Sequence, residues 1–384
     1  MNNNQPIRVL QVVYKMHRAG TETLLMRIYR NIDRNKVQFD FLVHTDQPGH
    51  YDNEIRDLGG RIIYIPVLPT KNYLLYTKTL KNIILQNGPY TCVHSHLLLL
   101  SGVILKVAYS AKIPLRIAHS HSDADGKGNN FSRRVYRWYL RHQIRHYATH
   151  MLAVSRPAGE WLFGKNCWQD SRVQILHNAI DLKPYEMLCQ DRLKLRKELG
   201  LPIDGILLGH IGRFELLKNH RKVLEIFSHL VKLQPAAHLI LVGEGSLEGE
   251  VRSLIKSLGL QDQVYMLGVR SDIPELMGAL DLFLFPSLFE GLGIVLIEAQ
   301  AAGVPCIISD TIPTEADLGL GLVKILPLSA DCDIWARAAL GAIDSSRLPW
   351  STREKSLKLN NYNISELALK LQELYSYENN SANY

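Results

Sequence analysis

Two glutamates flank a glycine turn in the stretch FEGLGIVLIEAQAAGVP, residues 289–305. Glu290 precedes Gly-Leu-Gly, and Glu298 stands eight positions later within an apolar, helix-forming run. Such runs usually exclude carboxylates, because burying an unpaired charge is costly. The pattern therefore raises the hypothesis that a ligand uses both carboxylates. The alternative is that Glu298 is an ordinary helix residue that faces solvent.

The residues around this stretch indicate what the ligand is. LFLFPS (282–287) is typical of a buried strand, and a helix is expected from about Ile294 to Ala302. Free amides at a helix start attract anions, and glycines allow a ligand to approach the backbone closely. One carboxylate then lies before the anion site and the other beyond it. A nucleotide-sugar, with hydroxyls on both sides of a diphosphate, matches this order.

Histidines recur at spacing two in VHSH and AHSH, which supply His94, His96, His119 and His121. Imidazole is a common metal ligand, and H-x-H on a strand places both rings on one face. No carboxylate or cysteine is patterned beside them. We therefore predict no metal site, and a structural histidine is the alternative at each position.

Length and composition limit the class of protein. A chain of 384 residues predicts two domains, and 46% hydrophobic with 21% charged residues is typical of a globular protein. The sequence contains no apolar run of about 18 residues, the length that a membrane-spanning helix needs. The N-terminal stretch lacks the features of a secretion signal, and the five cysteines are scattered without a CxxC pair. A cytoplasmic protein without a disulfide framework or zinc site is expected.

The net charge of +7 is unevenly distributed. Residues 1–200 carry a net +14 and residues 201–384 a net −7. This division suggests two bodies with different partners. The basic half could face anionic lipid, a phosphate-bearing acceptor or nucleic acid.

Apolar runs alternate with helical patterns along both halves, which predicts parallel sheets covered on both faces. The runs expected to form strands are 7–14, 39–44, 61–67, 91–96, 115–121, 151–155, 206–212, 238–245, 264–268, 282–287, 305–310 and 322–326. We predict an N-terminal Rossmann-like domain at 1–185, a linker at 186–203 and a C-terminal domain at 204–360. Residues 361–384 are expected to form a helix that packs back on the N-terminal domain.

The order of the motifs resembles that of a known family. FPSLFEGLGIVLIEAQAAGVPCIISD is similar to the Glu-x7-Glu signature of retaining glycosyltransferases of family four, including exopolysaccharide-type enzymes. KMHRAGTET (15–23), VHSH, AHSH, LHNAID (176–181), GRFELLKNH (212–220) and VGEGSLEGEV (242–251) stand in the expected order. The usual Gly-Gly is Ala19-Gly20 here. The resemblance implies the GT-B fold, in which two Rossmann-like parallel-sheet domains face a central cleft.

The resemblance also implies roles for particular residues. Arg213 and Lys218 contact the donor diphosphate, Glu290 the sugar and Glu298 the ribose, while a histidine after the strand near Pro114 lies close to the reacting sugar. His119 and His121 compete for this last role, and we favour His121 because it is nearer the carboxyl end of the strand. The residues implied in catalysis are His121, Arg213, Lys218 and Glu290. Those implied in donor binding are Gly20, Gly212, Gly268, Val269, Arg270, Gly291, Leu292, Gly293, Ile294, Val295 and Glu298.

Three other patterns suggest different chemistry and are set aside. Asp123-Ala-Asp125-Gly126 resembles a calcium loop, but Arg134 occupies the position of its last glutamate. Its Asp-x-Asp also resembles the metal motif of a different glycosyltransferase fold. The glycines at 243, 245 and 249 miss the dinucleotide-binding spacing by one residue. Residues 130–150 are basic and aromatic but carry no RNA-binding signature, so no nucleic acid partner is expected.

We therefore predict a retaining glycosyltransferase that transfers sugar from a UDP-sugar to a glycan or lipid-linked acceptor, without a metal or other cofactor. Arg213, Lys218 and the helix start would stabilise the departing diphosphate. Arginines recur every four residues at 133, 137, 141 and 145, beside an apolar stripe of Tyr136, Leu140 and Ile144. The arginines could hold the protein near anionic lipid or grip an acceptor diphosphate. The alternative is an ordinary surface helix, with the stripe packed on the first domain and the arginines solvated. The alternatives are an epimerase or phosphorylase of the same fold, or a non-catalytic protein that binds sugar nucleotides or glycans.

Overall fold

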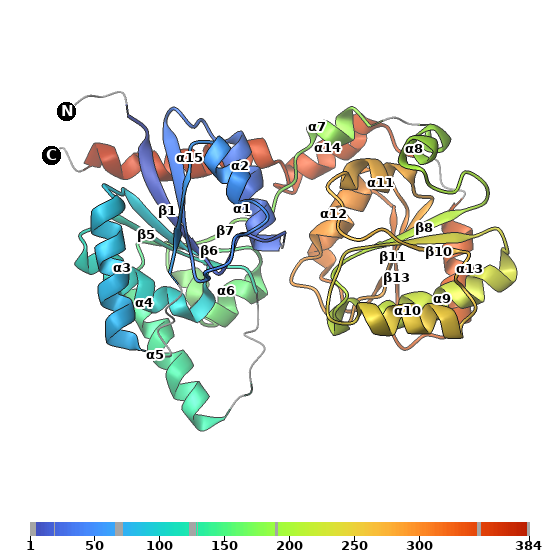
Figure 1. The fold of residues 1–384 in the computed structure, drawn as a ribbon, viewed down its shortest axis with the longest axis horizontal. Coiled ribbons are helices and arrows are strands. Elements are labelled where there is room, and N and C mark those ends of the chain that lie inside the picture. Colours follow the sequence, from blue (N-terminus) through green and yellow to red (C-terminus); the bar gives the residue numbers. More distant parts are fainter. Residues whose placement is uncertain are drawn as a thin grey trace. The chain divides into compact units, whose positions relative to one another are not determined.

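The structure is a computed structural model that describes residues 5–18, 20–65, 72–122, 128, 130–188, 191–343 and 347–381. Ala19 and the Asp123–Gly126 motif lie outside these residues. The chain divides into two compact units. Unit 1 comprises Met1–Ile180 and Asn361–Tyr384, and unit 2 comprises Asp181–Asn360. Figure 1 shows that each unit consists of a sheet between layers of helices.

Unit 1 contains a seven-stranded parallel sheet in the order β3-β2-β1-β4-β5-β6-β7. Its strands are β1 (Ile7–Val13), β2 (Val37–Val43), β3 (Arg61–Tyr64), β4 (Cys92–Ser95), β5 (Leu115–Ser120), β6 (His150–Ala153) and β7 (Val173–Ile175). Its helices are α1 (Gly20–Asn31), α2 (Asp52–Asp57), α3 (Tyr73–Asn87), α4 (Ser101–Ser110), α5 (Phe131–Tyr147), α6 (Arg156–Phe163) and α15 (Ile364–Ser381), with 3-10 turns η1 (Leu98–Leu100) and η2 (Cys167–Gln169).

Unit 2 contains a six-stranded parallel sheet in the order β10-β9-β8-β11-β12-β13. Its strands are β8 (Leu207–Ile211), β9 (His238–Val242), β10 (Val264–Met266), β11 (Leu282–Phe285), β12 (Cys306–Ser309) and β13 (Val323–Leu326). Its helices are α7 (Lys183–Glu186), α8 (Arg192–Leu199), α9 (His220–Leu233), α10 (Glu248–Ser257), α11 (Ile273–Ala279), α12 (Ile294–Ala301), α13 (Cys332–Ile343) and α14 (Trp350–Leu359), with 3-10 turns η3 (Leu216–Lys218) and η4 (Thr314–Ala316). The prediction of two Rossmann-like parallel-sheet domains is confirmed.

The two faces of the first sheet pack on different helices because successive side chains of a strand point to opposite sides. Val9 and Val13 of β1 belong to a core with residues of α1 and α15. Leu10 and Val12 belong to the opposite core, with residues of α3, α4, α5 and α6. Gln11 of β1 therefore faces α15, and this polar side chain is fully buried. This alternation decides where polar side chains on the strands meet.

The segment predicted as a linker, 186–203, contains helix α8 of unit 2. The Arg196 side chain in this helix is buried, and it donates from Nε to the Ala279 carbonyl oxygen over 2.9 Å and pairs with Asp281. The division between the units falls instead at residues 180 and 181 and at residues 360 and 361.

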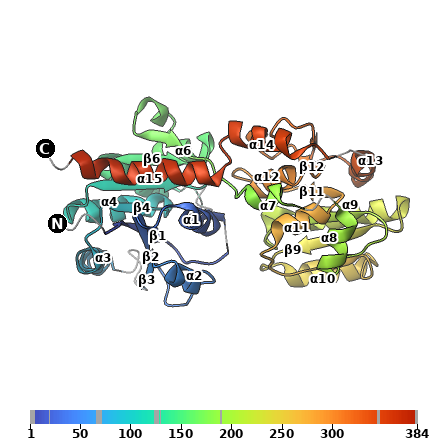
Figure 2. The ribbon, with the colours of Figure 1, turned by 90° about the horizontal axis from the view of Figure 1, so that it is seen from above.

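The C-terminal helix α15 belongs to unit 1, where it packs against α1 (Figures 1 and 2). Leu371 and Tyr375 of this helix are buried in the same core as Val9 of β1. Residues from the two ends of the chain therefore build one core. None of the helices in the described part of the chain has the length and apolar character needed to cross a membrane.

Candidate active site

The strand order of unit 2 changes direction between β8 and β11. From β8 the chain continues to β9 and β10 on one side, whereas β11 leads to β12 and β13 on the other. A switch of this kind in a parallel sheet opens a crevice at the carboxyl ends of the strands, where ligands bind. Arg213 and Lys218 follow β8, while Glu290 and Gly293 follow β11. The topology therefore brings these sequence-predicted residues to one edge of the sheet.

Lys218 and Glu290 form a close ion pair at this edge. Lys218 Nζ lies 2.6 Å from Glu290 Oε1, and the two side chains are 24% and 10% exposed. The ammonium also lies 5.4 Å from the ring centroid of Phe285, the last residue of β11. Partial burial strengthens the pairing because water screens it less. A cation and a carboxylate are thus held side by side, 72 residues apart in the sequence.

Backbone contacts hold the loop that carries Lys218. Asn219 adopts the left-handed conformation with φ of 53°, and its Nδ2 donates to the Pro286 carbonyl oxygen over 3.0 Å. The Leu288 amide donates to the Leu217 carbonyl oxygen over 2.8 Å. These bonds tie the loop after β8 to the end of β11. The sequence analysis did not select Asn219, although its place directly after Lys218 in LKNH is a usable signal, since asparagine tolerates positive φ.

Three loops meet at this edge through glycine backbone. A Cβ built on Gly243, which has φ of +137°, would lie 2.2 Å from the Gly212 carbonyl oxygen. The Gly243 amide donates to the Gly268 carbonyl oxygen over 2.8 Å. Larger residues cannot approach the backbone this closely. Gly243, one of the glycines that failed the dinucleotide-binding spacing, thus brings the ends of β8, β9 and β10 together.

Helix α12 begins at this edge without a side-chain cap. Its N-cap is Gly293, which has φ of +81° and no side chain to accept from the first amides. Leu292 and Val295 are buried. The first amides of a helix have no partner within the helix, and the helix dipole adds positive potential there. The turn Gly291–Gly293 and the amides from Ile294 onward therefore form an anion-binding geometry.

The other predicted donor-binding residues of unit 2 differ in exposure. Glu298 is only 6% exposed, so the solvent-facing alternative for this residue is wrong. Arg213 is exposed and has no ion-pair partner among the described residues. Arg270 pairs with Asp272, with 2.8 Å between Nε and Oδ1, beside the exposed Val269. Arg213 is thus a cation that can reach an incoming anion.

Two neutral histidines lie next to the Lys218 loop. Burial lowers the pKa of His210 to about 4 and that of His220 to about 2. Their rings meet edge to face with centroids 4.7 Å apart, and the nearby Lys218 charge lowers both pKa values further. Both imidazoles therefore stay neutral near pH 7 and add no positive charge to the edge.

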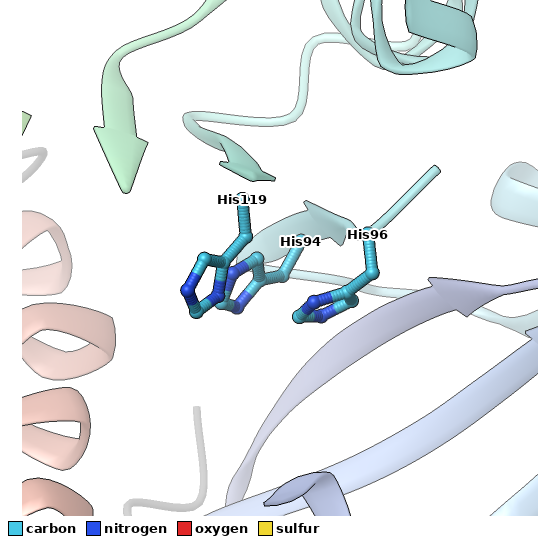
Figure 3. Close-up of side chains that lie close together, drawn as sticks. All are labelled: His94, His96 and His119. Atoms are coloured by element: carbon cyan, nitrogen blue, oxygen red, sulfur yellow. The ribbon is translucent and has the colours of Figure 1, made fainter. Parts of the chain in front are cut away.

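Unit 1 has its own switch point, between β1 and β4, and histidines gather beside it. His94 and His96 come from β4 and its end, and His119 and His121 from β5 and its end. His94 and His119 stack with ring centroids 5.3 Å apart, and Figure 3 shows the two rings side by side. His96 Nδ1 lies 2.8 Å from His121 Nε2. The sequence analysis paired the histidines only within each H-x-H and predicted no metal site, whereas the structure brings all four together.

Burial keeps these imidazoles neutral. Desolvation lowers the pKa of His94, His96 and His119 well below the usual histidine range, and it lowers that of His121 to about 3. His121 is half-buried, whereas His119 is 1% exposed. Of the two competing histidines, His121 is therefore the more accessible.

Gly20, the predicted phosphate contact in unit 1, is the exposed first residue of α1. A Cβ built there would meet no atom within 4 Å.

Comparison with known proteins identifies the family. Residues 191–318 match the family "Glycosyl transferases group 1", and residues 19–179 match "Glycosyl transferase 4-like domain". EpsF of Bacillus subtilis strain 168, a protein named as a glycosyltransferase, is 39% identical over 90% of this chain and 90% of its own length. The chain belongs to the GT-B glycosyltransferases of family four.

Other proteins resemble this glycosyltransferase over most of its length. The UDP-Gal:alpha-D-GlcNAc-diphosphoundecaprenol alpha-1,3-galactosyltransferase of Escherichia coli is 24% identical over 88% of this chain and 89% of its own length. HepE of Anabaena, crystallised with UDP, has a TM-score of 0.75 at 18% identity, covering 97% of this chain and all of HepE. WaaG, a glycosyltransferase of lipopolysaccharide biosynthesis, has a TM-score of 0.70 at 20% identity, covering 96% and 99%. At these identities the two solved structures support the fold alone.

Helix α5 gives this glycosyltransferase an exposed aromatic and basic surface on unit 1. Phe131, Val135 and Trp138 are exposed on the helix, and Arg134 lies on the same side. A groove of 660 Å³ runs along these residues. The predicted apolar stripe is partly correct, since Leu140 and Ile144 are buried whereas Tyr136 is exposed.

Two of the four regularly spaced arginines of α5 donate hydrogen bonds to backbone carbonyls of α6. Arg145 Nε donates to the Phe163 carbonyl oxygen over 2.9 Å, and Arg141 donates to the carbonyl of Trp161. Both acceptors belong to the last turn of α6, where carbonyls lack partners within the helix. These two arginines therefore fix α5 to α6.

Proposed function

We propose that this chain is a retaining glycosyltransferase that transfers sugar from a UDP-sugar to a glycan or lipid-linked acceptor. The observation that carries this proposal is the 2.6 Å Lys218–Glu290 pair beside the uncapped start of α12, at the switch point of unit 2. One edge then offers a cation and amides for a diphosphate and a carboxylate for sugar hydroxyls. The family to which the chain belongs supports the same reaction class.

In this reaction the bond between the sugar and the β-phosphate oxygen breaks, and its electron pair stays on the diphosphate. The acceptor hydroxyl forms the new glycosidic bond and loses its proton. Negative charge grows on the diphosphate as the bond breaks, so fixed positive groups there lower the barrier. Arg213, Lys218 and the first amides of α12 supply that charge without reorganisation.

The remaining assignments follow the resemblance of the motifs. Glu290 would accept hydrogen bonds from sugar hydroxyls and Glu298 from ribose hydroxyls, as their places before and after the anion-binding turn suggest. The backbone at Gly268–Arg270 would contact the base. In unit 1, Gly20 would contact phosphate and His121 the sugar. Glu298 is buried within the second turn of α12, which suits a side chain that orders a ligand hydroxyl rather than one that binds water.

The names of similar proteins support the donor and acceptor classes. HepE was crystallised with UDP and with UDP-glucose, and the Escherichia coli relative is named for transfer from UDP-Gal to a diphosphoundecaprenol-linked sugar. We therefore propose a UDP-sugar as donor and a glycan or lipid-linked intermediate of surface polysaccharide assembly as acceptor.

A panel of nucleotide-sugars tests this proposal. The correct donor and UDP should raise the melting temperature of unit 2, because ligand binding stabilises the folded state by mass action. Incubation with that donor should release UDP slowly, and an acceptor should accelerate release and yield an α-linked product from an α-linked donor. Release of a β-linked product would contradict retention. An epimeric donor would indicate an epimerase, sugar phosphate formed with inorganic phosphate would indicate a phosphorylase, and binding without turnover would indicate a non-catalytic protein.

We also propose that no divalent ion assists the diphosphate, because Arg213, Lys218 and the α12 amides provide the positive field. UDP affinity in calorimetry should be unchanged by Mg²⁺ or Mn²⁺, and transfer should not increase when either ion is added. If EDTA removes activity and Mn²⁺ restores it, the proposal fails and Asp123 and Asp125 become candidate ligands.

Finally, we propose that α5 places unit 1 on an anionic membrane surface, where a lipid-linked acceptor would be found. Its exposed Phe131 and Trp138 suit the apolar boundary of lipid headgroups, and Arg134 and Arg137 suit their phosphates. Arg137 also donates to the Gly128 carbonyl oxygen over 3.2 Å, which leaves Arg134 as the better probe of lipid contact.

A further inference from the structure

The two H-x-H motifs of unit 1 lie on adjacent parallel strands. Register pairs His94 of β4 with Ile117 of β5 and Ser95 with Ala118, so His119 follows beside His96. Cys92 and Ile117 belong to the core that includes α15, and residues two apart on a strand share a face. The rings of His94, His96 and His119 therefore converge on one face under α15 (Figure 3).

Buried amide and phenol groups orient two of these rings. Gln11 Oε1 accepts from His96 Nε2 over 2.9 Å, which leaves His96 Nδ1 as the nitrogen with a lone pair. The Tyr375 hydroxyl lies 2.8 Å from His94 Nδ1, and Gln11 Nε2 donates to that hydroxyl over 3.4 Å. Histidines that bind metals almost always have the other ring nitrogen held by such a group. Gln11 and Tyr375 thus hold these two rings in the way that the outer shell of a metal site holds its ligands.

Several ring nitrogens in the cluster lack a hydrogen-bond partner within the described residues. These are His94 Nε2, both nitrogens of His119 and His121 Nδ1, and the side chains of His94 and His119 are each 1% exposed. Leaving a buried polar atom unsatisfied costs about 1–3 kcal/mol. An occupant that accepts lone pairs would satisfy one nitrogen of each neutral imidazole, namely His94 Nε2 and whichever His119 nitrogen carries no proton. A hydrogen-bond donor or a metal ion has this property, and the outer-shell contacts favour the ion.

We propose that His94, His96 and His119 bind a divalent transition-metal ion of the zinc class. One ring nitrogen from each residue can be chosen so that all three lie within 4.8 Å of one another. Tetrahedral zinc with bonds of about 2.0–2.1 Å needs its nitrogens about 3.3 Å apart, so small ring rotations would close the site. Three neutral imidazoles favour zinc, cobalt, nickel or copper over magnesium and calcium, which prefer oxygen ligands.

The ion would also release His121. In the structure His121 Nε2 lies 2.8 Å from His96 Nδ1, the same nitrogen that would bind the ion. Metal and His121 therefore compete for one lone pair. With the ion bound, His121 would lose this hydrogen bond and could take the fourth position or turn away from the cluster. Occupancy would thus couple to the orientation of the histidine that we propose for sugar contact.

The test is metal binding by the full chain, purified without a polyhistidine tag and stripped with a chelator. Titration with Co²⁺ should give one equivalent bound, with the intense visible absorption of tetrahedral cobalt, and Zn²⁺ should displace it. Elemental analysis of protein that has not been stripped should find zinc at about one ion per chain. If wild-type protein binds no Co²⁺ above background, the proposal is wrong and the cluster is a metal-free hydrogen-bonded network.

Variants separate the site from adventitious binding. His119→Gln should abolish stoichiometric Co²⁺ binding, and Tyr375→Phe, which removes the hydroxyl beside His94, should weaken it about 10–100-fold. His44→Gln is the matched control, because His44 is buried in the same unit but bonded to the Val13 carbonyl oxygen and the Tyr76 hydroxyl. This control should retain one equivalent. Unchanged binding in His119→Gln would overturn the proposal.

Folding and donor binding are measured in parallel. Circular dichroism and melting curves identify a variant that does not fold, in which case Tyr375→Phe and the wild-type titration decide the question. UDP affinity in calorimetry should be the same with and without Zn²⁺, because Lys218, Glu290 and α12 belong to unit 2. Loss of activity on stripping that Zn²⁺ restores, and Mg²⁺ or Mn²⁺ does not, would locate the effect at the histidines and leave the metal-free diphosphate site intact.

Discussion

The carboxyl-end edges of the two sheets satisfy their polar groups in different ways. In unit 2 the edge holds an ion pair, an exposed arginine and uncapped helix amides, with glycines that bring three loops together. In unit 1 the edge beside β4 and β5 holds four imidazoles that burial keeps neutral. Both edges come from a parallel sheet with a switch point. The same architecture therefore carries positive groups and uncapped amides in one unit and neutral imidazoles in the other, and the residues decide which.

The contrast predicts that charge-removing changes in unit 2 have the largest effect on transfer. Lys218→Ala removes a cation from the departing diphosphate, and we expect kcat to fall about 100–1,000-fold, the range for removal of one electrostatic stabiliser. Glu290→Gln should lower transfer to a similar extent. If Glu290 contacts only the sugar, UDP affinity in calorimetry should stay within a few-fold of wild type.

Glu225→Gln is the control for Glu290→Gln, because Glu225 lies on α9 and faces Arg221 at 4.0 Å on the surface. It should leave both transfer and UDP affinity unchanged. Equal loss of UDP affinity and transfer in Glu290→Gln would place this carboxylate at the nucleotide rather than at the sugar.

Lowering the pH should reduce the stability of unit 1 more than that of unit 2. A histidine with a lowered folded pKa binds fewer protons than it does unfolded, so its share of stability is complete above about pH 6.5 and falls as pH drops toward the folded pKa. For His121 this window extends from about 6.5 down to about 3. As the pH falls through this window, each such histidine lowers the free energy of unfolding by up to about 1.4 kcal/mol per pH unit.

In unit 1 the pKa is lowered for the four histidines of the cluster and for His44 and His150, against His210, His220 and His238 in unit 2. Hydrogen exchange of the metal-stripped protein between pH 7.5 and 5.5, corrected for intrinsic rates, should therefore show earlier loss of protection in β4 and β5 than in β8 and β11. His121→Gln should reduce the pH dependence of unit 1 alone. Equal loss of hydrogen-exchange protection in both units would mean that the histidine cluster is not the acid-sensitive element.

The sequence predicted twelve of the strands that the structure describes, because each lies in a largely apolar run. It missed β7, which has three residues with Gln174 exposed between its neighbours. Glu290 and Lys218 were predicted separately, but their pairing required β8 to lie beside β11, which spacing along the chain does not reveal. The same limit explains why the cluster of four histidines was not predicted. Each H-x-H indicated one face, whereas their meeting depends on the adjacency of β4 and β5 and on Tyr375 from the far end of the chain.

A smaller effect is expected for Glu298, which tests whether the buried carboxylate serves the nucleotide. Glu298→Gln keeps the size of the side chain but removes the charge that would accept ribose hydroxyls. UDP binding should weaken by about 1–3 kcal/mol, the value of a lost charged hydrogen bond. Calorimetry measures this directly, and a melting curve checks that the variant folds. Unchanged UDP affinity would show that Glu298 supports α12 rather than ligand.

The smallest effect concerns α5 and lipid. Each basic residue near an anionic surface contributes about 1 kcal/mol, and salt screens it. Sedimentation with vesicles should therefore increase with anionic lipid content and decrease with salt. Arg134→Ser with Trp138→Ser should bind less, since one cation and one exposed aromatic ring are lost. Lys232→Ser with Leu233→Ser removes one charge and one exposed apolar side chain from α9 of unit 2 and should bind as wild type does. If both double variants and wild type sediment equally, binding does not use α5. If none sediments at low salt, the acceptor is a soluble molecule and the aromatic face of α5 serves another contact.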